Sequence, residues 1–163
     1  MKKIIFALLL ALPMTVFAQK LGHVNSNDIM QAMPEVATLQ KDMEALQKQY
    51  ADELKRREDQ LQADNEAYEK EKAGLSETLK QFREQKLQKD FQDYQQFAQT
   101  CDNDYKTQYQ TKLQAIQEKV LAAVKSVGEA EGCAYVFDAQ TIPFIGASAT
   151  DLTAKVKTAL GIK

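Results

Sequence analysis

The chain has 163 residues, with 21 Lys and Arg against 23 Asp and Glu, six glycines, three prolines and no tryptophan. Its formal net charge of −2 argues against whole-protein nucleic-acid binding, which usually needs a basic surface. Between Pro34 and Gly128 there is no other proline, and Gly74 is the only glycine. This composition is typical of long helices rather than of a compact domain with many turns.

Residues 1–18 are predicted to form a secretory signal peptide that is cleaved after Ala18. Lys2 and Lys3 supply the positive start, residues 4–12 are apolar, and residues 16–18 fit a cleavage site. A membrane anchor would need about 20 apolar residues, roughly twice the length of this run. Removal of the two lysines leaves 19 basic against 23 acidic residues, so the mature chain carries a formal charge of −4.

The central feature is a helical hairpin predicted over residues 35–131, with its tip near residues 73–77. Ser76 is expected to cap the returning helix, and Gly132 to end it. Beyond Leu54 the first helix keeps one apolar residue per heptad where a coiled coil normally has two, so we expect the outer half to be weakly held and mobile. The apolar stripes comprise Val36, Leu39, Met43, Leu46, Tyr50, Leu54, Leu61, Tyr68 and Leu75, then Leu79, Leu87, Phe91, Tyr94, Ala98, Cys101, Tyr105, Tyr109, Leu113, Ile116, Val120, Val124 and Val127.

The segments on either side of the hairpin, residues 19–34 and 132–163, are predicted to form one small body at its open end. The hairpin brings its own ends together, so a strand before it and a strand after it can pair. This body is too small to bury a stable core comfortably by itself, which favours oligomerisation. The expected elements are a strand over 20–25, a short helix over 26–33 capped by Ser26, a strand over 133–138, an edge strand over 141–146, and a final helix over about 151–160 capped by Ser148 or Thr150.

The sequence contains no catalytic or metal-binding motif. There is no HExxH, GxSxG, P-loop or CxxC arrangement, and His23 is the only histidine. Cys101 lies within a helix and Cys133 beyond its end, roughly 45 Å apart at 1.5 Å per residue, whereas a disulfide needs Cα atoms within about 7 Å. The thiols are therefore free or pair between chains. Asp138 is interpreted as a strand-end turn residue, and we predict no enzyme activity, cofactor or metal.

Two surface features of the hairpin point to binding. Phe82 and Phe97 lie off the apolar stripe by roughly 120° and 60°. Exposed aromatic residues near a mobile tip favour a contact surface for apolar partners, although Phe82 could instead cover the hairpin turn. Residues 70–90 carry six basic against four acidic side chains, so the tip is slightly positive on an acidic shaft.

Three short motifs occur in order along the mature chain. They are Lys20-Leu21-Gly22-His23-Val24-Asn25-Ser26 followed by Ile29, then Tyr135-Val136-Phe137-Asp138, and finally Asp151-Leu152-Thr153 with Val156 and Leu160. With the signal peptide and the hairpin between them, they resemble the Skp/OmpH family of periplasmic chaperones. The resemblance implies a mainly α fold, in which a long antiparallel hairpin projects like a tentacle from a small trimerising α/β body.

The resemblance also implies a function in the periplasm. Three arms would surround a cavity that holds unfolded outer-membrane β-barrel proteins without ATP and prevents their aggregation. Family members are often strongly basic, whereas this mature chain is acidic, which leaves lipopolysaccharide or membrane-surface binding an open question. From their positions in the predicted hairpin and body, we expect these roles to fall to Leu61, Tyr68, Leu75, Leu79, Phe82, Phe91 and Phe97 for apolar client binding; to Lys80, Arg83, Lys86 and Lys89 for attraction at the tip; and to Val24, Ile29, Tyr135, Val136 and Phe137 for trimerisation.

Two other functions fit the same hairpin. A coiled-coil spacer or adaptor of the cell envelope would dock one folded partner through the tip. A binder of membrane surfaces or nucleic acid would use the basic tip, with binding that falls steeply as salt is added. The acidic shaft makes the last hypothesis the weakest.

Overall fold

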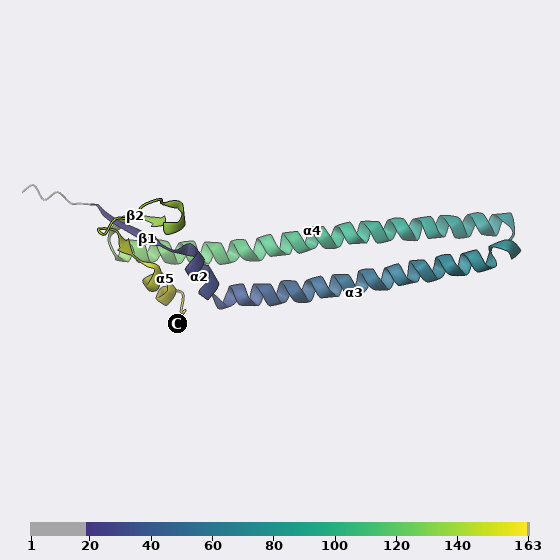
Figure 1. The fold of residues 1–163 in the computed structure, drawn as a ribbon, viewed down its shortest axis with the longest axis horizontal. Coiled ribbons are helices and arrows are strands. Elements are labelled where there is room, and N and C mark those ends of the chain that lie inside the picture. Colours follow the sequence, from purple (N-terminus) through teal and green to yellow (C-terminus); the bar gives the residue numbers. More distant parts are fainter. Residues whose placement is uncertain (1–18, 163) are drawn as a thin grey trace, which may run out of the picture.

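The computed structural model describes residues 19–162, so the predicted signal peptide lies outside the described residues. Two long antiparallel helices, α3 (Pro34–Glu71) and α4 (Glu77–Ala130), extend from a small body that contains both ends of the described chain (Figure 1). A 3-10 turn, η2 (Lys72–Gly74), joins them at the tip. The predicted fold class, a long helical hairpin on a small α/β body, is confirmed.

The ends of the hairpin helices follow local backbone chemistry. Pro34 occupies the first turn of α3, where its missing N–H removes no helical hydrogen bond. Ser76 stands at the N-cap of α4 with an extended backbone, as predicted, but its side chain makes no capping hydrogen bond. Gly132 follows α4 with φ of +67°, a conformation that glycine adopts without steric cost, and it ends the helix as expected.

The body contains a three-stranded parallel sheet in the order β2-β1-β3. The central strand β1 (Lys20–Val24) pairs with β2 (Cys133–Asp138), which confirms the predicted pairing across the hairpin. The expected edge strand over 141–146 is wrong. After the short turn η3 (Ala139–Thr141) the chain forms neither helix nor strand over 142–149, where Pro143 has no N–H to give to a sheet, and β3 (Thr150–Asp151) completes the sheet instead.

The short helices of the body are capped by residues other than those predicted. The cap of α2 (Ser26–Ala32) is Asn25, whose side chain accepts a hydrogen bond from the N–H of Asp28 at 3.2 Å. Ser26 instead donates its hydroxyl to Asp138 at the end of β2. For α5 (Thr153–Ala159), Leu152 is the cap residue, and neither Ser148 nor Thr150 serves. The carboxylate of Asp151 accepts a hydrogen bond from the N–H of Thr153 at 2.8 Å. Asp151 thus takes the capping contact that was expected of Thr150, which lies one residue farther from the helix.

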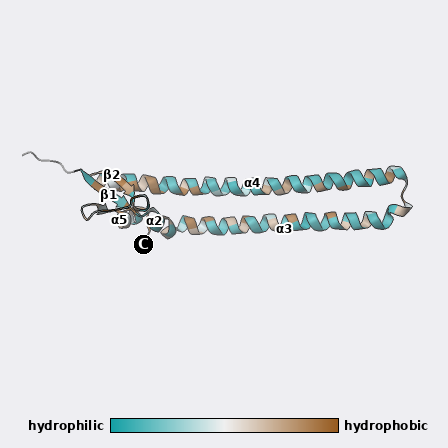
Figure 2. Cartoon of the chain, turned by 45° about the horizontal axis from the view of Figure 1, so that its top comes forward, coloured by the Kyte–Doolittle hydropathy of each residue, from teal (hydrophilic) through white to brown (hydrophobic). Residues whose placement is uncertain are grey.

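The core of the molecule lies in the body and the base of the hairpin. Ile29 and Leu152 are completely buried, and the cluster continues along the helices to Met43 on α3 and Ile116 on α4. Gly128 allows α4 to approach β2 closely, since a Cβ atom there would lie 2.8 Å from a methyl group of Val136. Figure 2 shows hydrophobic residues concentrated along the base of α4, whereas the outer hairpin is largely hydrophilic. Apolar packing alone therefore does not hold the outer halves of α3 and α4 together, and other contacts between the two helices must contribute.

Candidate functional site

Charged residues on the seam of the outer hairpin make contacts from one helix to the other. The apolar seam residues recur every seven residues from Leu54 on α3 to Leu75 just after η2, and Arg57, Asp64 and Glu71 occupy the alternate seam positions on α3. The guanidinium of Arg57 lies 3.9 Å from the ring centroid of Phe97. Asp64 pairs with Lys86 at 3.7 Å, and Glu71 pairs with Arg83 at 3.2 Å. Each position that lacks an apolar residue thus has a polar cross-helix contact in its place.

Two tyrosine hydroxyls add further cross-helix bonds. Tyr50 donates to Asp104, and Tyr68 donates to Glu84. The hydrogen bond to a carboxylate, with a smaller contribution from burial, raises the pKa of each tyrosine to about 12. Tyr68 is 3 % exposed, which makes it the most buried residue of the outer hairpin. Tyr68 therefore packs in the interface between α3 and α4 near the tip.

One register holds along the hairpin. Successive contacts are 7, 8, 7 and 14 residues apart along α3 and the same 7, 8, 7 and 14 residues apart back along α4, so these contacts share one register from the base to the tip. The contacts that share this register are Glu35–Lys119, Asp42–Lys112 at 2.7 Å, Tyr50–Asp104, Arg57–Phe97, and Glu71–Arg83.

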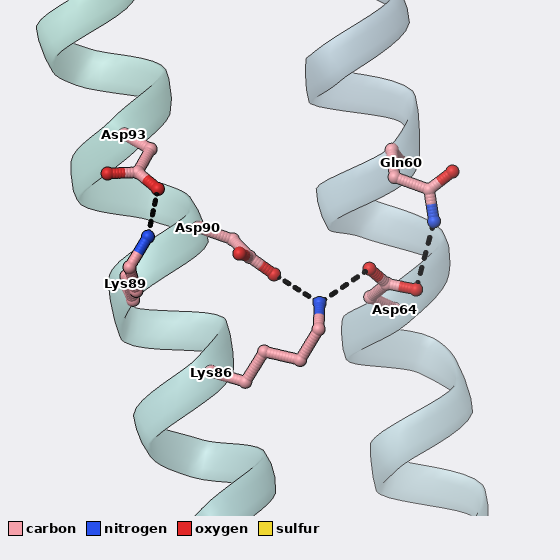
Figure 3. A network of polar contacts seen from close by, with 6 residues as sticks. All are labelled: Gln60, Asp64, Lys86, Lys89, Asp90 and Asp93. Atoms are coloured by element: carbon pink, nitrogen blue, oxygen red, sulfur yellow. Dashed lines mark hydrogen bonds and ion pairs between the residues drawn. The ribbon is translucent and has the colours of Figure 1, made fainter.

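The four cations predicted to attract clients are each paired with an acidic side chain. Figure 3 shows Lys86 between Asp90 of its own helix, at 2.5 Å, and Asp64 of α3. Lys89 pairs with Asp93 at 2.6 Å, and these hydrogen bonds to carboxylates raise the pKa values of both lysines. The other two cations are Lys80, which pairs with Glu77 at 3.6 Å, and Arg83, which pairs with Glu71. The tip is thus a network of alternating charges rather than a basic patch.

The seven predicted apolar contacts divide by exposure. Leu79, Phe82 and Phe91 are 51 %, 63 % and 51 % exposed, and all three lie on the outer part of α4. Phe82 lies off the seam as expected. The placement of Leu79 and Phe91 on the buried stripe was wrong, because the facing part of α3 has only one apolar residue per heptad to cover them. Of the others, Leu61 and Leu75 are half-buried, Tyr68 is buried, and Phe97, expected to be exposed, is partly covered by Arg57.

The residues predicted for trimerisation also divide. Val24 and Ile29 are buried within the core of the chain itself, and Val136 packs against α4 at Gly128. Tyr135 and Phe137 are 58 % and 42 % exposed, with their rings stacked at a centroid distance of 6.0 Å. Of the five residues predicted for trimerisation, only Tyr135 and Phe137 face outward. The sequence reasoning missed Leu121 on α4 and Phe144 in the irregular segment between η3 and β3, which are also largely exposed.

Other kinds of site are not supported in the part of the chain that the structure describes. Over residues 19–162, no three His, Cys, Asp or Glu side chains come together where a metal ion could be held. None of the helices in that range is both long enough and apolar enough to cross a membrane. Cys101 and Cys133 are free thiols, and burial raises the pKa of Cys101.

Comparison with known proteins decides the family. The model of the OmpH family, described as "Outer membrane protein (OmpH-like)", matches residues 20–160, nearly all of the described chain. The chain belongs to the OmpH/Skp family of periplasmic chaperones. Members of this family are not enzymes, which agrees with the prediction from motifs. The resemblance inferred from the three sequence motifs is thereby confirmed.

Two proteins similar to this OmpH-family chain show how far the sequence differs while the fold is shared. It is 29 % identical over 143 residues to the chaperone protein Skp of Pectobacterium atrosepticum, a match that covers 85 % of this chain and 84 % of that protein. Its fold is similar to that of a putative outer membrane chaperone (OmpH-like) from Caulobacter crescentus, with a TM-score of 0.76 and 15 % identity. That alignment covers 87 % of this chain and 83 % of the other. The hairpin and body thus persist while most of the sequence changes.

Proposed function

We propose that this chain is an ATP-independent periplasmic holdase, which binds unfolded outer-membrane β-barrel proteins and prevents their aggregation. The observation that carries the proposal is the group of exposed apolar side chains on the outer part of α4, at Leu79, Phe82 and Phe91. Their surroundings are hydrophilic, so they offer separate apolar contacts on a soluble surface. Such contacts bind an unfolded chain without fixing its conformation, and they shield strand edges that would otherwise associate.

The proposed active form is a homotrimer in which three arms surround the client. The small body and the outward aromatic pair Tyr135 and Phe137 support association of copies. Residues 19–34 and 132–163 would form the trimerising unit, and residues 35–131 the arm. With three arms, weak contacts act together, because binding of one raises the effective concentration of the others.

Apolar contacts rather than net positive charge carry the capture in this proposal. Lys80, Arg83, Lys86 and Lys89 each satisfy an acidic neighbour, so they attract a client only where a client carboxylate replaces that neighbour. Exposed ion pairs contribute at most about 1 kcal/mol, so such exchange is easy but adds little affinity. We therefore expect capture to weaken only slightly between low and high salt.

The test is suppression of light scattering when a urea-unfolded outer-membrane β-barrel protein is diluted into buffer with the chain. Full burial of a Phe side chain contributes about 1.5–3 kcal/mol, so Phe82→Ser should weaken client binding roughly tenfold or more. Phe91→Ser should act similarly, and Phe97→Ser less, because Arg57 covers that ring. Gln88→Ser, an exposed polar position between the two most affected sites, is the matched control.

Three outcomes would reject this proposal in different parts. A chain that fails to suppress scattering but forms one defined complex with a folded envelope protein would be the adaptor of the alternative hypothesis. Equal capture by Phe82→Ser, Phe91→Ser and Gln88→Ser would reject these aromatic residues as contacts. Loss of capture between about 0.05 and 0.5 M salt would assign it to charge, since screening shortens the range of exposed charges.

A further inference from the structure

One exposed side of α4 consists almost entirely of amide side chains. At about 100° per residue, the positions of residues 81–117 that fall within an arc of roughly 80° hold ten amide residues and a single charged residue, Lys106. All ten amide residues are exposed. We call this set the amide stripe, and its members are Gln81, Gln85, Gln88, Gln92, Gln96, Gln99, Asn103, Gln110, Gln114 and Gln117.

The amide stripe takes no part in holding the hairpin together. Seam residues of α4 such as Leu87 and Ile116 lie roughly 130° around the helix from the middle of the stripe. Arg83 and Lys86, which form ion pairs with α3, also lie outside its arc. The stripe is therefore a separate surface, uncharged over most of its length, on an arm that is otherwise rich in charges.

Most amide groups of the stripe are free to bind something else. Gln99 donates to Asn103 at 3.2 Å, and Gln114 donates to Glu118 at 2.8 Å. Within residues 19–162, the remaining seven of the ten make no side-chain hydrogen bond. A side-chain amide offers N–H donors and a carbonyl acceptor, the same groups that a peptide bond presents. The stripe can thus pair with both polar groups of a polypeptide backbone, whatever the sequence.

The dimensions of the stripe match an extended segment. From Gln81 to Gln117 it runs about 54 Å along the helix, at 1.5 Å per residue, which equals the length of roughly 16 residues of an extended chain. Its amides recur every three or four residues, or about 4.5–6 Å, whereas a strand repeats every two residues, or about 6.6 Å. The two repeats do not coincide, so a segment pairs at a few points in any register and is not fixed in one.

An unfolded client fits the stripe better than a folded partner or a second copy does. Between Gln81 and Gln117 the stripe contains no aromatic or aliphatic residue, so it lacks the apolar centre that a stable protein interface needs. Exposed apolar residues lie at its two ends instead. Phe82, beside the stripe at the tip, is 63 % exposed, and Leu121, in line with it toward the body, is 68 % exposed.

We propose that the amide stripe holds the backbone of an extended client segment by hydrogen bonds between side-chain amides and peptide groups. This role rests on the holdase function proposed above and adds a second kind of contact to the apolar residues of the arm. Peptide groups occupied by the stripe are withdrawn from pairing with the strand edges of other unfolded chains. Because the contacts are uncharged, added salt should not weaken them.

The test is titration of a fluorescently labelled, urea-unfolded outer-membrane β-barrel protein with the processed chain, followed by fluorescence anisotropy. One neutral hydrogen bond changes an equilibrium about two- to tenfold. A variant with Ala at Gln85, Gln88, Gln92 and Gln96 should therefore raise the client Kd at least tenfold. Ala favours helix, so this loss would not come from unfolding of the arm. Gln88→Ser alone should change the Kd less than twofold, because the client can shift to neighbouring amides.

Two controls separate the amide group from other effects of the substitutions. Asn at the same four positions keeps the amides and should leave the Kd within about threefold of wild type. Ala at four exposed glutamines of α3, which stand among charged residues, should leave it within about twofold; these are Gln40, Gln47, Gln49 and Gln62. Circular dichroism and sedimentation report whether helices and mass are unchanged.

Binding through the backbone is tested with a 16-residue peptide from a client strand. N-methyl groups on alternate residues remove half of its N–H donors, so this form should bind the wild type at least fivefold more weakly than the unmodified peptide. The two forms should bind the four-Ala variant alike. Equal binding of both forms to the wild type would show that client side chains are bound, and would overturn the proposal.

Other contrary results have distinct meanings. A four-Ala variant that binds the client like wild type would show that the stripe is only a solvated face. Equal weakening by the four-Asn variant with its helices intact would reject the amides as the contact, and so would equal weakening by the α3 control. A changed mass of the four-Ala variant would assign the stripe to contacts between copies. A wild type that binds no client would reject the holdase function and the stripe with it, whereas the other results leave the holdase function standing.

Discussion

Truncation of Tyr68 tests whether the outer hairpin is held at its most buried residue. Tyr68 is 3 % exposed, donates its hydroxyl to Glu84, and lies one heptad from Leu61 and from Leu75 along the seam. Tyr68→Phe removes one hydrogen bond and should cost about 1 kcal/mol, because Glu84 is exposed and water can replace the hydroxyl. Tyr68→Ala also removes the buried ring and should cost about 3–5 kcal/mol.

The loss should be local, because the main core lies at the opposite end of the hairpin. Amide hydrogen exchange measures local opening directly. Tyr68→Phe should speed exchange over residues 61–90 about fivefold, and Tyr68→Ala more than a hundredfold, at about 1.4 kcal/mol per factor of ten. Residues 113–127 at the base serve as an internal reference, and Tyr109→Ala, which truncates an exposed tyrosine, as the matched control. Unchanged exchange at the tip of Tyr68→Ala would refute the reasoning and leave the polar contacts as the main restraint.

Three further predictions concern the body and the middle of the arm. Leu152→Ala, at a completely buried site, should lower the free energy of unfolding by about 2–5 kcal/mol, whereas Leu79→Ala at an exposed site should change it by at most about 0.5 kcal/mol in urea titrations. The hydrogen bond from Ser26 lowers the pKa of Asp138 in the folded chain, so the ionised carboxylate stabilises the fold above about pH 4, the ordinary range of Asp, and this stabilisation is lost as the pH falls further. Asp138→Asn should therefore make the free energy of unfolding fall less steeply with decreasing pH. An unchanged pH dependence of the free energy of unfolding would contradict this prediction. In a Cys133→Ser background, maleimide should label Cys101 at least a hundredfold more slowly in the native chain than in urea, since the thiol is buried and its pKa is raised; equal rates would show that the arm opens freely.

The hairpin was predictable because its signals are long and mutually consistent. The apolar stripes run over dozens of residues without an interrupting proline, and Pro34 and Gly132 mark the two ends near the body. Strand pairing across the hairpin followed from its geometry alone. The register of that pairing was not predicted, because two short strands pair almost equally well when shifted by a residue unless the packed faces are known.

The parts that were mispredicted depend on short-range competition between similar groups. A strand of two residues, β3, has no periodicity to detect, and its position is set by the hydrogen bond from the N–H of Leu152 to the carbonyl of His23 at 2.8 Å. The N-cap of α2 is Asn25 rather than the predicted Ser26, because both of these adjacent residues have a side chain suited to capping.

The outer seam could not be predicted from apolar periodicity. Charged residues such as Asp64 break the stripe, and the expected consequence was a loose end. The structure instead pairs them across the helices, a choice that depends on the reach of long side chains such as Lys86 and on the register of the hairpin. The exposure of Phe91 was also not predictable from α4 alone, because whether a residue of α4 is covered depends on the residues that face it on α3.

The matched spacing of contacts along α3 and α4 makes arm length independent of the body. Deleting one heptad from each helix near the tip would shorten the arm by about 10 Å, at 1.5 Å per residue, while every contact nearer the body keeps its partner. Because β1 and β2 lie side by side in one sheet, both ends of the hairpin stay anchored whatever its length. A nested series of such deletions would thus shorten the arm in steps of one heptad while the body stays the same, and in the proposed trimer the space between the arms would become shallower by the same steps.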